Sequence, residues 1–187
     1  MEAKIVYFDK PGAENTEEVL RIAKLRAEEL GIKTVVVSTT VGDTAIRAVE
    51  VFKKMKVIVV THYTGMKGPN IQELTEENRK KIEVKKGVIL TTAHVFTGIG
   101  GAMRKKFNMY LLGDVMANTL RIFGQGIKVA CEITMMAADA GLVRTDEDVI
   151  AIAGTGRGAD TAVLLSPVNS MDFFDMKVKE ILCKPHF

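Results

Sequence analysis

Two segments rich in glycine and threonine contain the residue types that bind anions. The earlier segment, residues 39–45, reads TTVGDTA and leads into an expected helix. The first N–H groups of a helix lack internal partners, the helix dipole adds about half a positive charge there, and glycine lets an anion come close. The alternative is that Thr40 or Asp43 only caps this helix. The candidate phosphate-binding residues of this segment are Thr39, Thr40, Gly42, Asp43 and Thr44.

The later segment, residues 154–161, reads GTGRGADT. Such a loop can form a nest of backbone N–H donors, and the Arg157 guanidinium adds a charged fork that suits phosphate oxygens. The glycine spacing is GxGxG rather than GxGxxG, so it is not a dinucleotide-binding fingerprint. The alternative is a tight hairpin-like turn that binds nothing. The candidate residues are Gly154, Thr155, Gly156, Arg157, Gly158 and Thr161.

Two further segments, residues 61–65 and 91–98, place histidines and aromatic rings after expected strands. A planar ligand ring would pack on Tyr63 or Phe96, next to hydrogen-bonding imidazoles. Two histidines without a carboxylate at a defined spacing do not make a zinc site, so we predict no metal. A catalytic histidine and a histidine that satisfies loop backbone groups remain alternatives. The candidates here are His62, Tyr63, His94, Phe96 and Thr97.

The elements that position these segments alternate between strands and helices. Short β-branched runs such as 34–38 and 57–61 are typical of strands buried on both faces of a parallel sheet. Asn15 and Glu18 have the spacing of a capping box, and Gly31 ends the first helix. Strands are expected at 5–8, 34–38, 57–61, 87–92, 149–153 and 161–168, and helices at 15–30, 42–52, 75–86, 111–123 and 129–140; residues 176–183 are expected to form an edge strand or a short helix.

The strand-helix-strand units imply right-handed parallel crossovers. The fold class predicted is therefore α/β, a three-layer α/β/α arrangement with a mostly parallel sheet. Residues 1–187 contain no low-complexity linker, so we expect a single domain. Ligands of such sheets bind outside the carboxyl ends of the strands, where all the candidate loops should lie.

Composition argues against several classes of partner. A net charge of +3, from 26 Lys and Arg against 23 Asp and Glu, and the absence of Trp give no basis for nucleic-acid binding. No apolar run approaches the ~20 residues of a membrane span, and the N-terminus has no cleavable signal, so no membrane association is expected. Cys131 and Cys183 belong to no Cys cluster, which suits a reducing compartment. We expect a cytoplasmic protein.

The order of a helix, TVVVSTTVGDTAIRA, VIVVTH, a long excursion and VIAIAGTGRGADTAVLL resembles the C-terminal α/β domain of pyruvate kinase over residues 15–168. In that family the first loop holds a phosphate of an allosteric sugar phosphate, and the later glycine-rich loop closes over it. The resemblance therefore implies phosphate binding by the residues already named in 39–44 and by Gly154, Gly156, Arg157, Gly158 and Thr161. The catalytic barrel of pyruvate kinase takes about 250 residues, so we expect no pyruvate kinase activity here.

Resemblance to the free-standing, prokaryotic and archaeal branch of this family further implies flavin mononucleotide (FMN) as the ligand. Subunit contacts in the parent family imply a homo-oligomer, with residues 112–123 and 129–140 as its interface. The expected function is thus binding of a phosphorylated small molecule, FMN first, with the reaction left open. The alternative is a regulatory module that senses a sugar phosphate without catalysis. A third possibility is a hydrolase or transferase that uses His62, His94 or Asp160.

Overall fold

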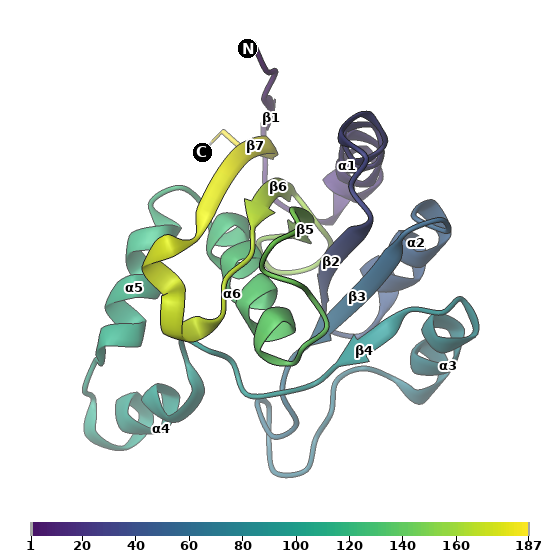
Figure 1. Cartoon of the computed structure of the whole chain (residues 1–187). Coiled ribbons are helices and arrows are strands. Elements are labelled where there is room, and N and C mark those ends of the chain that lie inside the picture. Colours follow the sequence, from purple (N-terminus) through teal and green to yellow (C-terminus); the bar gives the residue numbers. More distant parts are fainter. Residues whose placement is uncertain (1, 187) are drawn as a thin grey trace.

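The computed structural model describes residues 2–186 and contains one seven-stranded sheet (Figure 1). Its strand order is β1-β7-β6-β5-β2-β3-β4. Only β6 runs antiparallel to its neighbours, so the predicted α/β class with a mostly parallel sheet is confirmed. The strands are β1 (Val6–Phe8), β2 (Thr34–Thr39), β3 (Lys56–Thr61), β4 (Val88–Leu90), β5 (Val149–Ala153), β6 (Thr161–Ser166) and β7 (Lys177–Pro185).

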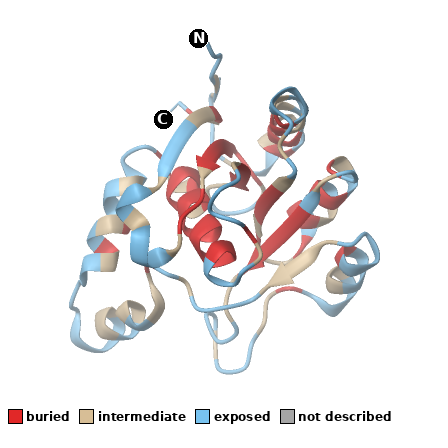
Figure 2. Cartoon of the chain, in the orientation of Figure 1, coloured by how far each residue is buried: buried red, intermediate tan, exposed pale blue. Residues whose placement is uncertain are grey.

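Helices cover both faces of the sheet, which gives the three predicted layers (Figures 1 and 2). One core lies between the sheet and α1, α2 and α3, and a second core lies between the sheet and α6. Alternate residues of β2 face the two cores: Val35 and Val37 pack towards α1 and α2, and Val36 packs towards α6. The helices are α1 (Thr16–Leu30), α2 (Asp43–Val51), α3 (Glu76–Val84), α4 (Gly98–Phe107), α5 (Leu112–Arg121) and α6 (Gln125–Asp139), with 3-10 turns η1 (Ala13–Asn15) and η2 (Ser170–Asp175).

The start of α1 differs from the prediction. Asn15 has helical backbone angles and no side-chain capping bond, and its amide donates instead to the carbonyl of Lys10 at 2.8 Å. The capping box with Glu18 is therefore absent, because η1 continues directly into α1 and Asn15 belongs to that turn. The predicted end is confirmed: Gly31 takes the left-handed conformation, with φ of 67°.

Two other predicted elements change position. The C-terminal segment is a strand, but β7 lies between β1 and β6, so it is an inner strand and β1 forms the edge. Helix α6 starts at Gln125, four residues earlier than predicted, because Gly124 with φ of 129° separates it from α5 and leaves residue 125 free to begin a new helix. Two of these four residues, Gln125 and Lys128, line a cavity at the edge of the sheet.

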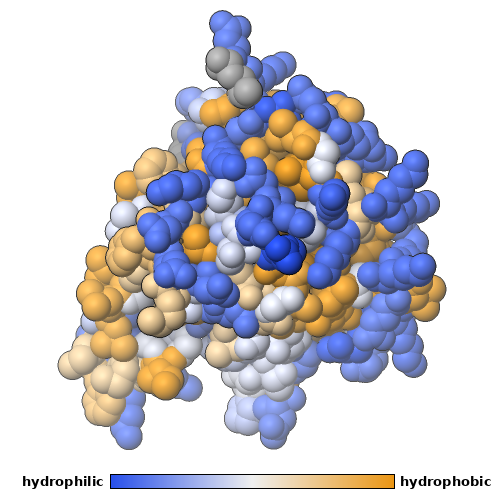
Figure 3. All heavy atoms as spheres, in the orientation of Figure 1, coloured by the Kyte–Doolittle hydropathy of each residue, from blue (hydrophilic) through white to orange (hydrophobic). Residues whose placement is uncertain are grey.

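The α4–α5 region lies beside the three layers and leaves apolar side chains exposed (Figures 1 and 3). Ile99 of α4 and Leu112 of α5 are each 81% exposed, and Val115 and Phe123 are also exposed. Helix α6 is enclosed between the sheet and α5, so it does not offer the free interface that the sequence analysis expected of residues 129–140. Homo-oligomer formation stays a prediction, and of the two predicted interface segments only residues 112–123 leave large apolar side chains exposed. Within residues 2–186, no helix is long and apolar enough to cross a membrane.

Candidate ligand-binding site

A cavity of about 600 Å³ opens at the carboxyl ends of β2, β3 and β5. The amino-terminal ends of three helices form much of its wall: Thr16 of α1, Thr44 of α2 and Gln125 of α6 all line it. None of these helices has a hydrogen bond from its N-cap side chain to its first turn. The cavity is therefore surrounded by the positive ends of helix dipoles, an arrangement that favours an anionic ligand.

The β2–α2 loop is short and ordered by local contacts. Thr39 Oγ1 accepts a hydrogen bond from the Gly42 N–H at 3.1 Å. Gly42 itself is the N-cap, so neither Thr40 nor Asp43 caps α2, and the alternative considered from the sequence does not hold. Gly42 has φ of 115°, and a Cβ there would lie 2.5 Å from Asn78 Cβ. The glycine is therefore required by the turn and by the approach of α3, and it does not itself line the cavity.

The β5–β6 loop is the turn of an antiparallel hairpin, held by a buried carboxylate. Asp160 is fully buried and accepts hydrogen bonds from the N–H groups of Thr155 at 2.9 Å and Gly12 at 3.2 Å and from the Thr161 hydroxyl at 2.8 Å. The Ala159 N–H donates to Thr16 Oγ1 at 3.0 Å. The hairpin is thus fixed to the start of α1, and Asp160 serves as its internal support.

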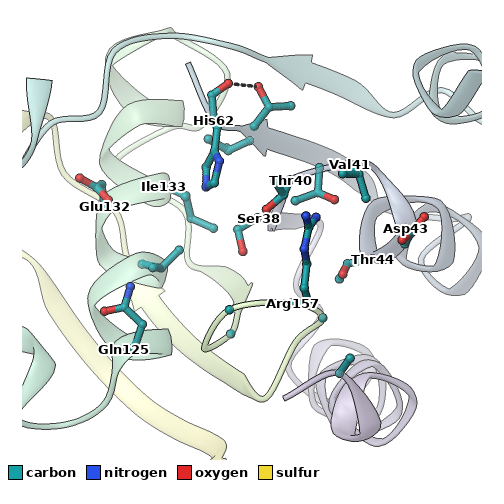
Figure 4. Close-up of a pocket in the computed structure, with 18 of the residues that line it drawn as sticks. Ser38, Thr40, Val41, Asp43, Thr44, His62, Gln125, Glu132, Ile133 and Arg157 are labelled. Carbon is teal, nitrogen blue, oxygen red and sulfur yellow. Dashed lines mark hydrogen bonds between the residues drawn. The ribbon is translucent and has the colours of Figure 1, made fainter. Parts of the chain in front are cut away.

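Arg157 occupies the exposed tip of this hairpin. Among residues 2–186 its guanidinium has no hydrogen-bond or ion-pair partner. Figure 4 shows the side chain reaching from its loop towards Thr40, with Thr44 beside it. The two segments singled out from the sequence therefore face each other across one cavity.

The charges around the cavity are predominantly positive. Four cationic side chains and two carboxylates line it. Arg47 is paired with Glu17 at 2.8 Å, outside the lining, whereas Arg157 has no ion-pair partner within residues 2–186, although its charge helps to lower the pKa of Glu73. The cations are Arg47, Arg121, Lys128 and Arg157, and the carboxylates are Asp43 and Glu132.

The two histidines lie together on the same rim, with ring centroids 5.8 Å apart. His62 Nδ1 is 2.7 Å from Glu73 Oε2, and this hydrogen bond lowers the pKa of Glu73. His94 Nε2 lies 3.5 Å from the carbonyl oxygen of Thr61, and burial lowers the pKa of His94. His94 is therefore neutral at pH 7, and it can donate or accept a hydrogen bond.

The structure brings most of the predicted residues to the cavity. Tyr63 packs its ring edge-on to His94 at 5.1 Å without lining the cavity, and Phe96 is buried against Ala117 and Met135. The Phe96 ring, which was expected to pack against a ligand, thus packs against other side chains of the protein. Thr155 and Thr161 instead bond to Asp160. Those that line the cavity are Thr39, Thr40, Asp43, Thr44, His62, His94, Thr97, Gly154, Gly156, Arg157 and Gly158.

The cavity wall contributed by α6 was not predicted from the sequence. Gln125, Lys128 and Glu132 lie on one face of this otherwise apolar helix and all line the cavity. Their spacing of three and four residues was a readable signal, because polar side chains that recur in this way share one helix face. Lys128 and Glu132 form an ion pair with side chains only 4% and 3% exposed.

One family model and two solved structures are similar to this chain. Residues 17–165 match the family model described as pyruvate kinase, alpha/beta domain. Among solved structures, pyruvate kinase of Cryptosporidium parvum in complex with ADP has a TM-score of 0.40 and 14% identity, covering 84% of this chain and 24% of that chain. O-ureido-L-serine synthase has a TM-score of 0.32 and 18% identity, covering 58% of this chain and 29% of that one.

This chain thus spans between 24% and 29% of the length of these two structures. The family model, in contrast, matches well over half of the chain. On the strength of that match, the chain belongs to the pyruvate kinase alpha/beta domain family.

Proposed function

We propose that the protein binds a phosphorylated small molecule, with its phosphate between the β2–α2 loop and the β5–β6 loop. One observation carries this proposal: the unpaired Arg157 guanidinium faces the uncapped amino terminus of α2 across the cavity. A phosphate dianion there would receive backbone N–H donors from α2 and a charge-assisted bond from Arg157. Bonds to ionised groups are about twice as strong as neutral ones, so this pole would contribute much of the affinity.

FMN is the ligand that we propose first. The cavity volume of about 600 Å³ lies within the usual range for small-molecule sites. Away from the proposed phosphate position, the cavity wall is partly apolar and includes Val60, Val129 and Ile133. The polar ring of His62 also lines the cavity. A ligand with one phosphate and one planar, partly polar ring suits this division. We assign no reaction.

Titration of purified protein with FMN and with riboflavin tests the phosphate site. We expect Arg157→Ala to weaken FMN binding by about tenfold to hundredfold, because it removes a charge-assisted bond worth about 1.5–3 kcal/mol. Thr44→Val should weaken it less. Both variants should bind riboflavin as the wild type does. Arg144→Ala is the matched control, since Arg144 is exposed, pairs with Asp146 and does not line the cavity.

Equal weakening towards FMN and riboflavin would show that Arg157 does not contact the phosphate. A protein that is colourless as purified and binds neither flavins nor sugar phosphates would contradict the proposal as a whole. Binding of a sugar phosphate without any flavin binding would replace FMN by the alternative of a sugar-phosphate sensor.

A further inference from the structure

The cavity has a second polar end, on the side of α6 away from the phosphate loops. Figure 4 shows Glu132 and Gln125 on one side of the cavity and Arg157 and Asp43 on the other, with Ile133 between them. Lys128 lies one helical turn before Glu132 and lines the same cavity. A ligand long enough to extend from Arg157 past Ile133 would therefore meet this end.

The buried ion pair at this end is incompletely hydrogen-bonded. Glu132 uses both of its oxygens: Oε1 accepts the Phe96 N–H at 3.0 Å, and Oε2 accepts from Lys128. The Lys128 ammonium has three donors, but within residues 2–186 only Glu132 accepts from it. The Phe96 ring stands 5.5 Å from Lys128 Nζ and offers only its π face. Two N–H donors of a nearly inaccessible cation are thus left without an oxygen partner.

The surroundings do not supply the missing acceptors. Within residues 2–186, neither nitrogen of His94 is hydrogen-bonded to Lys128; its Nε2 lies 3.5 Å from the Thr61 carbonyl oxygen. Arg121 is another cation, and it occupies the Gln125 side-chain oxygen at 2.7 Å. Donors therefore outnumber engaged acceptors at this end of the cavity; among the described residues, the buried Thr97 hydroxyl, which also lines the cavity, has no hydrogen-bond partner either. Since burying a cation without its hydrogen bonds is costly, an acceptor group from outside the chain would be stabilised here.

We propose that Lys128 is a specificity-determining binding residue that donates hydrogen bonds to an acceptor on the organic part of the ligand, a carbonyl oxygen or an anionic ring atom. This inference rests on the proposed function and extends it to the opposite end of the same ligand. For FMN the acceptors are the carbonyl oxygens of the flavin ring. The phosphate and the ring are then held by different cations, Arg157 and Lys128.

The test compares the double variant Lys128→Met, Glu132→Gln with the single variant Glu132→Gln. Removing Lys128 alone would leave a buried carboxylate unpaired, which is strongly destabilising, whereas the double variant removes both charges. In both proteins the amide that replaces the Glu132 carboxylate would keep an oxygen for the Phe96 N–H. The single variant retains the lysine donors and is the control for flavin binding. Because it leaves the Lys128 ammonium with a neutral amide as its partner, it is also expected to be destabilised, so its Tm is measured beside that of the double variant. The probes are FMN, riboflavin and inorganic phosphate, titrated separately.

We expect the double variant to weaken binding of FMN and of riboflavin by a similar factor, about tenfold or more, and to leave inorganic phosphate binding unchanged. Arg157→Ala should give the crossed pattern, with FMN and phosphate weakened and riboflavin unchanged. Glu132→Gln should retain most of the riboflavin affinity. The two cations would then be assigned to different parts of one ligand.

Unchanged flavin affinity in the double variant, with wild-type FMN binding intact, would overturn the role of Lys128 and leave the phosphate site standing. Equal losses for phosphate and riboflavin would also overturn it, because they would indicate a general structural defect. A wild-type protein that binds no flavin would overturn both proposals. If the double variant does not fold, Lys128→Arg keeps the ion pair but displaces the donors, and it should weaken riboflavin binding severalfold without affecting phosphate.

Discussion

The two loops that face each other across the cavity are supported by different parts of the chain. The β2–α2 loop is ordered by a hydrogen bond between residues three positions apart, from the Gly42 N–H to Thr39. The β5–β6 loop is ordered by residues from the other end of the chain: Gly12 donates to Asp160 and Thr16 accepts from Ala159. The first loop thus has a local hydrogen bond and further support from α3, whose Asn78 amide donates to the Val41 carbonyl at 2.9 Å, whereas the second depends on the packing of α1 against the sheet.

In the β5–β6 loop, the residues that stabilise the loop are therefore different from the residue proposed to bind the ligand. Asp160 and Thr16 are buried and fully used in hydrogen bonds, whereas Arg157 is exposed and projects from the scaffold that they make. In the first loop no such division exists, because the helix end itself would hold the anion. Substitutions in the β5–β6 loop should consequently divide into those that affect stability and those that affect only binding.

The largest effect is expected for Asp160→Ala. It removes the acceptor of two backbone N–H groups and one hydroxyl in a fully buried position. We expect the free energy of unfolding to fall by about 3 kcal/mol or more, measured by urea denaturation. Asp43→Ala, at the first residue of α2 beside the β2–α2 loop, is the control: Asp43 is exposed, and its replacement should cost less than about 1 kcal/mol. Similar losses in both variants would contradict the contrast between the loops.

A smaller effect is expected for Gly158→Ala, compared with Gly156→Ala. Both glycines have positive φ, 75° and 84°, so both substitutions carry the cost of a left-handed backbone, about 1–2 kcal/mol. A Cβ at Gly158 would in addition lie 2.3 Å from Ala13 Cα, whereas nothing lies within 4 Å of a Cβ at Gly156. Gly158→Ala should therefore be less stable by a further 1–3 kcal/mol or so, seen in the same urea titration. Equal stabilities would mean that the η1 turn does not pack closely against the hairpin.

The same contrast explains what could be predicted from the sequence. The β-branched runs of β2 and β3 and the glycine that ends α1 are local signals, and they predicted the sheet and the loops at its carboxyl ends. Gly42 and Arg157 were found in the same way. The role of Asp160 as a support was not predicted, because its partner Gly12 is 148 residues away and only the folded chain brings them together.

The burial of individual side chains was the other feature that could not be predicted from the sequence. Phe96 has the residue type of a ligand platform, and nothing in its neighbours along the chain shows that α5 and α6 enclose it. Lys128 and Glu132 carried a readable spacing, but the helix was predicted over residues 129–140, so Lys128 fell outside it and the pair was not recognised; in the structure ten other residues of α6 are also buried. A polar pair inside a buried helix indicates a cavity only when the fold is known.

A still smaller effect is expected on how the free energy of unfolding depends on pH. Its source is His94, which is partly buried at the end of the cavity near β4, whereas the tip of the β5–β6 loop is exposed. Burial lowers the pKa of His94 in the folded state, opposed by Glu132 and assisted by the positive charge of Lys128 and by His62. The unfolded chain then binds a proton more readily, so stability is complete above about pH 6.5 and falls as the pH drops below it. His94→Asn should flatten this part of the stability profile. A profile identical in both proteins would contradict the burial of a neutral imidazole.

The smallest effect is expected for Arg157→Ala without ligand. Because this guanidinium has no partner within residues 2–186, its removal should change the free energy of unfolding by no more than about 0.5 kcal/mol, a shift in Tm of roughly 2 °C or less. Ligand should reveal the difference: at an FMN concentration one hundred times the wild-type Kd, the wild type gains about 2.7 kcal/mol, and a variant bound tenfold more weakly gains about 1.4 kcal/mol. A loss of stability without ligand comparable to that of Gly158→Ala would place Arg157 among the supporting residues and remove the distinction on which the proposed phosphate site depends.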